Sequence, residues 1–560
     1  MDTHSVSYND SVEKRAASRI YQDLYLFQAR FPASPTYSDL CSTRSSSTMS
    51  NSLAIPHHIG IIGAGFSGLR CADVLLSHGF RVTIIEGRSR IGGRVHQATL
   101  RNGFPVDMGA NWVHGTTDNP VYEIAKATGT ACSGWDATQL VCDAEGVPLE
   151  TGEREELADL MWTIVLDAFA HSNKNSASID PKESLYDWFT QQVPKRIPES
   201  VDGWMRKREI VLQMADSWGT FIGSPVESQS LKFFWLEECV EGGEYCAQLR
   251  LENLFCEGTH RKVLEAIASH ALEKAEIIYE TIAHKIKYRS RESSSHEAVY
   301  VQCSSHETSL HDGSRIKVER TFEFDDVVVT TPLGWLKNNR DAFEPELPPR
   351  LCKAIDSISF GCLEKVYMTF ETPFWRKEPQ NSSSLSIQGF SQWLSPRYTA
   401  TNPEHWSQEL VELASLSAGN AHNTLLFYIF GDQSVYITST ISSLHSHKER
   451  TDFLTDHFRP YLNTMPGYNA SSPACAVVDC LASNWLNDEL AGNGSYANFQ
   501  VGLEEGDRDI EVMREGIPDR GLWLAGEHTA PFVALGTTTG AYWSGEAVGR
   551  RIAEKYEVGV

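Results

Sequence analysis

The sequence predicts an α/β protein in which a doubly wound, mostly parallel sheet is interleaved with an α+β domain built on an antiparallel sheet. The first observation is an apolar strand over 59–62, a helix over 69–77 and a second apolar strand over 81–86, the order of a βαβ unit. The second is the return of strand-like runs much later, at 277–288, 299–303, 324–330 and 522–525. The third is a set of antiparallel-looking strands at 366–370, 424–431 and 433–439.

The order of these segments predicts a tail and two interleaved domains. The tail, 1–54, is expected to be disordered, because its polar run at 41–52 buries too little apolar surface to offset the ordering entropy. Helical periodicity prevails over 155–250, and the Ser/His-rich stretch 304–314 is expected to be a loop. The first domain is assigned 55–134, 251–361 and 505–560, and the second 135–250 and 362–504.

Composition excludes several classes of protein. The chain has 560 residues and a formal net charge of −24, which argues against nucleic acid as a partner and favours attraction of cations. Its 12 cysteines include no C-x-x-C pair, and no histidine pattern indicates a metal site, so reduced thiols and no metal are expected. The absence of a signal-like or membrane-spanning apolar segment in the sequence predicts a cytoplasmic protein.

A glycine-rich turn links the first strand to the first helix. Residues 63–68 read GAGFSG, in which Gly63 permits a tight turn, Gly65 lets the backbone approach a pyrophosphate and Gly68 allows close helix–strand packing. Glu86 ends the second strand, where an acid binds ribose hydroxyls and disfavours a 2′-phosphate. This fingerprint predicts a Rossmann-like domain and does not decide between NAD and FAD.

The segments that follow resemble the flavin amine oxidase superfamily. Residues 86–94 (EGRSRIGGR) match its E-x-x-x-R-x-G-G-R extension, and 107–115 (DMGANWVHG) is similar to the polyamine and spermine oxidase branch. Three further blocks, within 257–282, 330–375 and 485–542, extend the resemblance over most of the chain. The resemblance implies that the first domain binds FAD. It also implies non-covalent attachment, because Ser495 stands where monoamine oxidases carry a cysteine.

The resemblance also implies four catalytic positions. Lys365 matches the lysine that holds a water near flavin N5, and His114 would face the substrate. Tyr496 would form one wall of the aromatic cage, and Thr537 takes the place of the opposite wall. Without the resemblance, a lone strand lysine such as Lys365 is more often a solvent-facing residue.

Cofactor contacts are implied along the same blocks. Ile282 would pack on the adenine, Glu527 would bind the ribityl–pyrophosphate region, and the backbone of Thr537 and Thr538 would stabilise negative charge on the flavin. The remaining implied contacts, beside Gly63, Gly65, Gly68 and Glu86, are Ala64, Ser67, Arg88, Gly92, Gly93, Arg94, Gly109, Ala110, Asn111, Trp112 and Trp485.

The activity implied by the resemblance is FAD-dependent oxidation of a small cationic amine, by hydride transfer from carbon to flavin N5. Spermine, spermidine or an N-acetyl derivative is the expected substrate, O2 the acceptor, and hydrogen peroxide, an aldehyde and an amine the products. A histone lysine demethylase-like enzyme and an amine oxidase of specialised metabolism are the alternatives. A non-catalytic flavin-binding protein is the alternative from another class.

Overall fold

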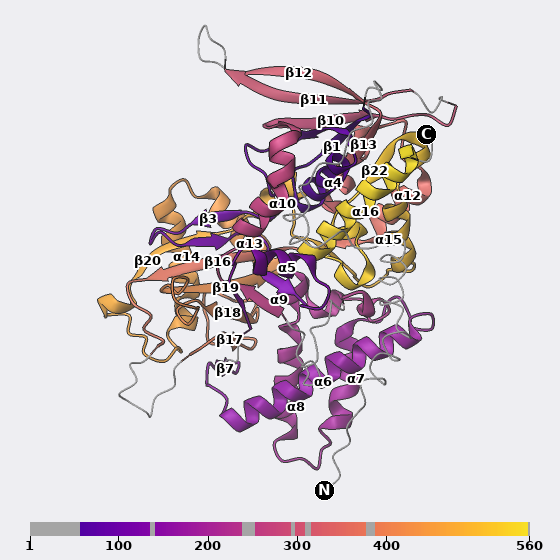
Figure 1. The fold of residues 1–560 in the computed structure, drawn as a ribbon. Helices are drawn as coiled ribbons and strands as arrows, with labels where there is room; N and C mark the ends of the chain where they lie inside the picture. Colours follow the sequence, from indigo (N-terminus) through magenta and orange to yellow (C-terminus); the bar gives the residue numbers. More distant parts are fainter. Residues whose placement is uncertain are drawn as a thin grey trace.

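The computed structural model describes residues 56–134, 140–237, 253–292, 297–308, 315–376 and 387–557. The predicted tail over 1–54 therefore lies outside the described residues, as do 238–250 of the predicted helical region and 309–314 of the predicted loop. Figure 1 shows two regions of sheet and helix built from alternating parts of the chain. The α/β class is confirmed, with one parallel sheet and a larger, mainly antiparallel sheet.

The parallel sheet has five strands that come from distant parts of the chain. Every neighbouring pair in it is parallel. Helices α4 (Phe66–Ser77), α10 (Arg261–Lys274) and α16 (Thr538–Glu557) pack on it around one apolar core. The strand order is β22 (Leu522–Leu524), β13 (Asp326–Val329), β1 (His58–Ile62), β2 (Arg81–Ile85) and β9 (Glu276–Ile278).

The second sheet has six strands and supplies the opposite side of the molecule. Its strand β16, next to the edge strand, alternates strictly: Val366 and Met368 enter an apolar core, whereas Lys365 and Tyr367 face the other way, toward residue 107. The strand order is β20 (Val477–Ala482), β16 (Leu363–Phe370), β19 (Thr424–Phe430), β18 (Gln408–Glu412), β17 (Phe390–Trp393) and β7 (Leu140–Cys142).

Two smaller parts complete the frame of the site. Strands β5 (Trp112–His114), β8 (Asn253–Cys256) and β6 (Cys132–Ser133) form a three-stranded sheet with β8 in the middle. The predicted helical region contains α6 (Thr151–Asn175), α7 (Leu185–Arg196), α8 (Trp204–Asp216) and α9 (Gly219–Ile222). Among the described helices, none combines the length and apolar character that crossing a membrane requires. The domain boundaries stay a prediction.

The predicted strand at 433–439 is wrong, because this segment lies in helix α13 (Gly431–Ser443). Gly431 turns the chain with φ +56° directly after β19. The buried side chains then follow helical spacing, with Ser434, Ile437 and Ile441 on the inner face. Packing against the sheet therefore overrides the strand preference of the β-branched residues.

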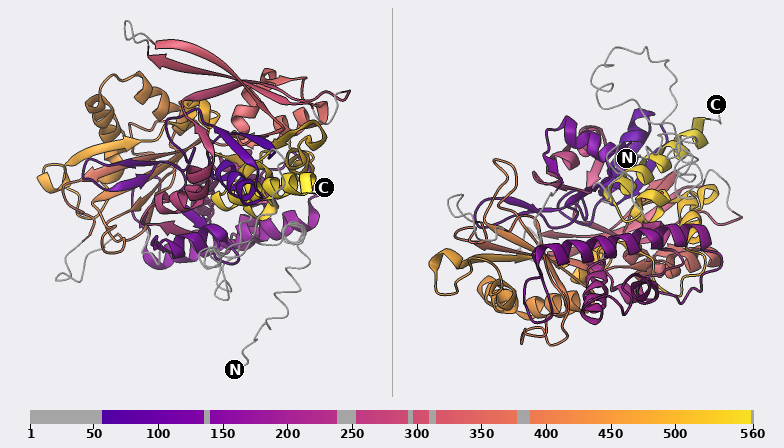
Figure 2. Two further views of the ribbon diagram at one scale, coloured as in Figure 1. Left: turned by 45° about the horizontal axis from the view of Figure 1, so that its top comes forward. Right: turned by 90° about the horizontal axis from the view of Figure 1, so that it is seen from below.

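The strand boundaries between 277 and 324 also differ from the prediction. The expected strand over 277–288 is two strands, β9 and β10 (Thr281–Lys287), since Glu280 has φ +49° and passes the chain to another sheet. The expected loop begins later, because β11 (Val299–Thr308) continues through 304–308 and pairs with β12 (Arg315–Phe324). Figures 1 and 2 show this long hairpin extending beyond the rest of the molecule.

Candidate active site

A cavity of about 620 Å³ lies where the two large sheets meet. Its wall includes the residues that follow four parallel strands: Gly63 after β1, Glu86 after β2, Thr330 after β13 and Glu527 near β22. The carboxyl ends of parallel strands are the usual ligand-binding edge of an open α/β sheet. Residues of the antiparallel sheet close the other side, so a cofactor and a substrate can share this cavity.

The glycine turn fits a dinucleotide pyrophosphate. Gly63 has φ +106°, and an added Cβ on Gly68 would lie 2.1 Å from the Gly63 carbonyl oxygen, so helix α4 packs tightly on the turn. No side chain caps the start of α4, whose N-cap residue is Gly65, and helix amide groups of this kind bind phosphates. The hydroxyls of Ser67 and Thr331 line the cavity, are buried, and have no hydrogen-bond partner among the described residues. A polar ligand in the cavity would satisfy them.

Glu86 holds the turn together at the predicted ribose site. Its carboxylate accepts hydrogen bonds from the backbone N–H groups of Ala64, at 2.7 Å, and Arg88, at 2.8 Å. The side chain also lines the cavity, so remaining lone pairs are available to hydroxyl groups of a ligand. Ile282 lies beside this region and is 41% exposed, an apolar surface suited to a flat base.

We expect Gly65→Ala and Gly68→Ala to separate cofactor binding from folding. Gly65 lines the cavity with an ordinary φ of −79°, and an added Cβ meets nothing within 4 Å. Gly65→Ala should therefore leave the melting temperature of FAD-stripped protein unchanged and weaken FAD affinity about tenfold or more by blocking the approach to the pyrophosphate. Gly68→Ala should instead lower that melting temperature, since its Cβ overlaps a backbone oxygen. Wild-type FAD affinity in Gly65→Ala, measured by fluorescence titration, would contradict this placement of the pyrophosphate.

An ion pair lies on the cavity wall beyond the turn. Arg94 Nη1 lies 3.0 Å from Glu527 Oε1 and also donates to the Ser495 carbonyl oxygen at 2.7 Å. Gly109 packs on the same arginine, and a Cβ there would lie 1.6 Å from the Arg94 carbonyl oxygen. These contacts bring together three segments that are far apart in the sequence. None of the described cysteines lines the cavity.

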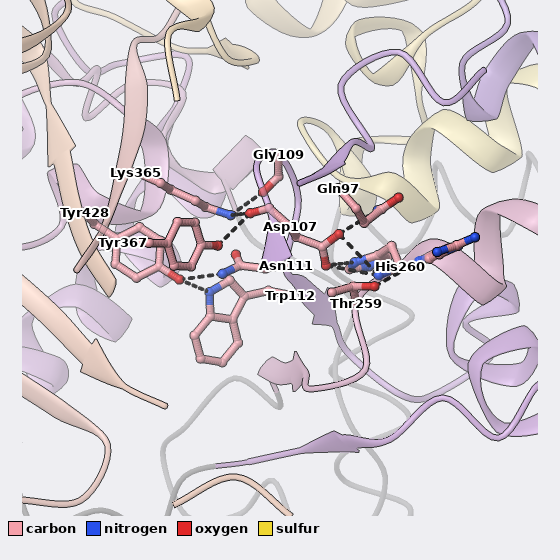
Figure 3. A network of polar contacts seen from close by, with 11 residues as sticks. Gln97, Asp107, Gly109, Asn111, Trp112, Thr259, His260, Lys365, Tyr367 and Tyr428 are labelled. Atoms are coloured by element: carbon pink, nitrogen blue, oxygen red, sulfur yellow. Dashed lines mark hydrogen bonds and ion pairs between the residues drawn. The ribbon is translucent and has the colours of Figure 1, made fainter. Parts of the chain in front are cut away.

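Lys365 is buried and lies at one end of the polar network drawn in Figure 3, which has Asp107 in its middle. Its Nζ donates to the carbonyl oxygen of Asp107, at 3.3 Å, and to that of Gly109. Tyr367 donates its hydroxyl to the Asp107 carbonyl oxygen at 2.6 Å. Burial lowers the pKa of Lys365 to about 7, and this effect outweighs the negative charges of Asp107 and Glu364, which raise it. This amine can therefore take up or release a proton near neutral pH.

Tyr428 joins the segment 111–112 to the antiparallel sheet. Its hydroxyl accepts hydrogen bonds from Asn111 Nδ2, at 2.9 Å, and from Trp112 Nε1, at 3.0 Å (Figure 3). Burial raises the pKa of Tyr428, so this hydroxyl keeps its proton. The indole of Trp112 stacks on Phe390 with centroids 5.8 Å apart, and both rings line the cavity as an aromatic wall.

The other three predicted catalytic residues line the same cavity. Desolvation lowers the pKa of His114, and its Nδ1 lies 2.7 Å from Asn253 Oδ1, which accepts the ring proton of the neutral tautomer. Tyr496 donates its hydroxyl to the Phe221 carbonyl oxygen at 2.5 Å. The Thr537 hydroxyl donates to the Ala534 carbonyl oxygen at 2.8 Å, directly before α16.

The structure brings all but two of the predicted site residues to this one cavity. Ala64 and Gly68 do not line it: the first donates its N–H to Glu86 and the second packs on Gly63. The roles of the individual residues stay predictions. The predicted residues on the wall are Gly63, Gly65, Ser67, Glu86, Arg88, Gly92, Gly93, Arg94, Gly109, Ala110, Asn111, Trp112, His114, Ile282, Lys365, Trp485, Tyr496, Glu527, Thr537 and Thr538.

Two acidic side chains on the cavity wall are not among the predicted site residues. Glu409 is buried, accepts hydrogen bonds from Thr220 Oγ1 at 3.0 Å and Gln392 Nε2 at 2.7 Å, and has its pKa raised by burial to about 7. Desolvation raises the pKa of Glu237 to about 8. For Glu409 the sequence offered one signal, an acid within the short strand 408–412 (QELVE). Acids are uncommon in buried strands, so such a residue is a candidate for a functional role.

A dinucleotide turn at the edge of a parallel sheet, next to a chamber closed by a second sheet, is typical of a protein that binds a dinucleotide cofactor beside a second ligand. The family model for flavin containing amine oxidoreductases matches residues 66–553. The chain belongs to this family, and its cofactor is FAD.

Individual relatives agree on the family and differ in their names. The chain is 25% identical to probable polyamine oxidase 5 of Arabidopsis thaliana, over 89% of this chain and 98% of that one. It is 26% identical to the human peroxisomal N(1)-acetyl-spermine/spermidine oxidase, over 87% and 92%. It is also 26% identical to protein FLOWERING LOCUS D of Arabidopsis thaliana, over 84% of this chain but only 52% of that protein.

Solved structures support the fold. Putrescine oxidase bound to putrescine superposes with a TM-score of 0.58 at 17% identity, over 89% of this chain and 99% of that one. A likeness at this identity establishes a shared fold.

Proposed function

We propose that this protein oxidises a diamine or polyamine, such as spermine, spermidine or an N-acetyl derivative, with O2 as the acceptor and hydrogen peroxide as a product. Bound FAD would supply the two-electron acceptor chemistry. The amine class of the family and the oxidase relatives support the reaction type. The cytoplasmic location predicted from the sequence is part of this proposal, and cell fractionation tests it.

One observation carries the choice of a substrate with two or more amines. Strands β16, β19, β18 and β17 are neighbours, and their register aligns Lys365 with Tyr428, Tyr428 with Glu409, and Glu409 with Gln392. All four side chains line the cavity. Because adjacent strands are about 4.8 Å apart, Lys365 and Glu409 lie about 10 Å from each other along this row. The row places a basic group and an acidic group where the two ends of a diamine chain can lie.

The wall chemistry suits such a molecule. Above pH 7 Glu409 carries a negative charge, and a bound ammonium lowers the pKa of the acid again because opposite charges favour ionisation. At the other end the reacting amine must be neutral. Lys365, with its pKa near 7, is the candidate group to receive a proton at Nζ. Trp112, Tyr428 and Tyr496 exclude water around that end, and His114 is held neutral to orient the substrate.

Glu409→Gln tests this proposal. Removing the charge should lower kcat/KM for spermine about tenfold to a hundredfold, as expected for a lost charge-assisted hydrogen bond, and leave kcat/KM for a simple monoamine unchanged. The matched control is Glu404→Gln, which removes the same charge at an exposed position outside the cavity. In the wild-type protein, KM for spermine should rise as pH falls through about 7, because Glu409 takes up a proton. That rise should be smaller in Glu409→Gln.

Peroxide release over polyamines, N-acetyl polyamines, monoamines and a methyl-lysine peptide separates the alternatives. Lysine-specific histone demethylase homologues are among the relatives, at 26% identity for homolog 1 of Arabidopsis thaliana. Turnover of the peptide alone would replace the polyamine proposal with a demethylase. FAD-loaded protein that releases no peroxide from any amine would support a non-catalytic flavin-binding protein.

A further inference from the structure

Two cysteines face each other across the small sheet behind the cavity. The register of β6 and β8 aligns Cys132 with Cys256. The neighbouring pair is hydrogen-bonded, because Glu257 N donates to the Ala131 carbonyl oxygen at 2.9 Å, so the two cysteines form the narrow, non-hydrogen-bonded pair. In such a pair the Cα atoms are about 4.5 Å apart and the side chains are closest. This separation lies at the short end of the range that a disulfide spans.

The two thiols differ in a way that suits oxidation. Cys132 is half-buried, and a hydrogen bond from Cys256 lowers its pKa. Cys256 is 2% exposed, and the same hydrogen bond, together with burial, raises its pKa. A partly exposed thiol with a lowered pKa is the attacking partner, and the neighbouring thiol is the resolving one. By contrast, burial raises the thiol pKa of Cys71, Cys142, Cys303, Cys362 and Cys480.

The cysteine pair is connected to the cavity through strand β8. The same strand carries Asn253, which is hydrogen-bonded to His114, and Leu254, which lines the cavity. On its other side, β8 pairs with β5, and Cys256 N donates to the Asn111 carbonyl oxygen at 2.9 Å. A displacement of β8 therefore reaches two predicted site residues.

We propose that Cys132 and Cys256 form a peroxide-reactive dithiol, which hydrogen peroxide oxidises to a disulfide. The Cys132 thiolate attacks one oxygen of hydrogen peroxide, the O–O bond breaks, and the departing hydroxide takes up a proton to become water. The Cys256 sulfur then attacks the sulfenic acid on Cys132. The S–S bond forms as the S–O bond breaks, and the oxygen leaves as a second water with the thiol proton. Two electrons pass from the two sulfurs to one peroxide molecule.

Oxidation should be reversible and should slow the enzyme. Disulfides prefer Cα separations of about 5.5–6 Å, so a bond across a pair about 4.5 Å apart is strained and easily reduced. The strain also moves β8 and the Asn253 side chain that orients His114. The source of peroxide in turnover rests on the proposed function, whereas the thiol chemistry does not.

The experiment uses full-length, FAD-loaded protein and added hydrogen peroxide, so that it is independent of the substrate. After removal of peroxide by catalase, peptide mass spectrometry under alkylating conditions should find Cys132 joined to Cys256, and dithiothreitol should release both thiols. Peroxide-treated wild type should lose activity several-fold and regain it with dithiothreitol. Cys132→Ser and Cys256→Ser should retain activity under the same treatment. Cys352→Ser, a half-buried cysteine elsewhere, should behave as wild type.

Three results would overturn the proposal: no joined peptide in peroxide-treated wild type, equal activity loss in both serine variants, or stoichiometric zinc that keeps both thiols unreactive. Zinc is included because the Asp107 carboxylate, the Cys256 sulfur and a ring nitrogen of His260 lie within 4.8 Å of one another. The joined peptide is measured in wild-type protein, so folding of the variants does not affect it. A joined peptide without peroxide release from any amine would count against the proposed function alone.

Discussion

Replacing Lys365 by Met is expected to lower kcat by about a hundredfold to a thousandfold, the usual contribution of a positioned proton-transfer group, while FAD stays bound. Lys365 is 4% exposed and donates to two carbonyl oxygens of the 107–109 segment. Met has a similar length and no polar atom that can carry a proton. Activity and flavin absorbance together distinguish lost chemistry from a lost cofactor.

The pKa of Lys365 also predicts the direction in which kcat changes with pH. Burial lowers the pKa of Lys365 to about 7, so its amine is neutral above that pH and able to accept a proton. The wild-type kcat should therefore rise as pH increases through about 7, and the Met variant should lack this rise. Lys337→Met is the matched control, because burial also lowers the pKa of Lys337, to about 8, but this lysine lies outside the cavity. Unchanged kcat in Lys365→Met would show that Lys365 has no proton-transfer role.

Local patterns in the sequence predicted much of the fold and the cofactor side of the site. The turn at 63–68 and the acid at Glu86 are determined by neighbours close in sequence, so one strand–turn–helix pattern contains them. The sequence predicted less about the antiparallel sheet. Alternation placed Lys365 and Tyr367 on one face of a strand, but it carried no information about which face meets residue 107.

The features that depend on register could not be predicted from one sequence. The role proposed for Glu409 depends on its alignment with Tyr428 in the neighbouring strand. The role proposed for Cys132 depends in the same way on its alignment with Cys256, which is far away in the sequence. No local pattern specifies such a register. The error at 433–439 has a related cause, since the β-branched residues of α13 favour a strand locally and tertiary packing decides otherwise.

Asp326→Ala is expected to lower the free energy of unfolding by about 3–5 kcal/mol, the cost of breaking a buried ion pair from one side. Asp326 begins β13, the strand next to β1 in the parallel sheet, and its side chain is 0% exposed. Its carboxylate binds Arg289 Nη1 at 3.0 Å, Lys555 Nζ at 2.6 Å and Trp523 Nε1 at 2.9 Å. The alanine variant leaves the guanidinium of Arg289, itself 4% exposed, buried without this partner.

Thermal unfolding followed by circular dichroism measures the effect, and KM for the amine should stay unchanged because Asp326 does not line the cavity. The control is Lys448→Ala, which breaks a pair with Asp452 whose side chains are 82% and 58% exposed and should cost no more than about 0.5 kcal/mol. Equal melting temperatures for the two variants would show that the Asp326 network does not stabilise the parallel sheet. A large loss for Asp326→Ala alone would instead show that this carboxylate ties β13 to α16, the helix that begins at Thr538 on the cavity wall.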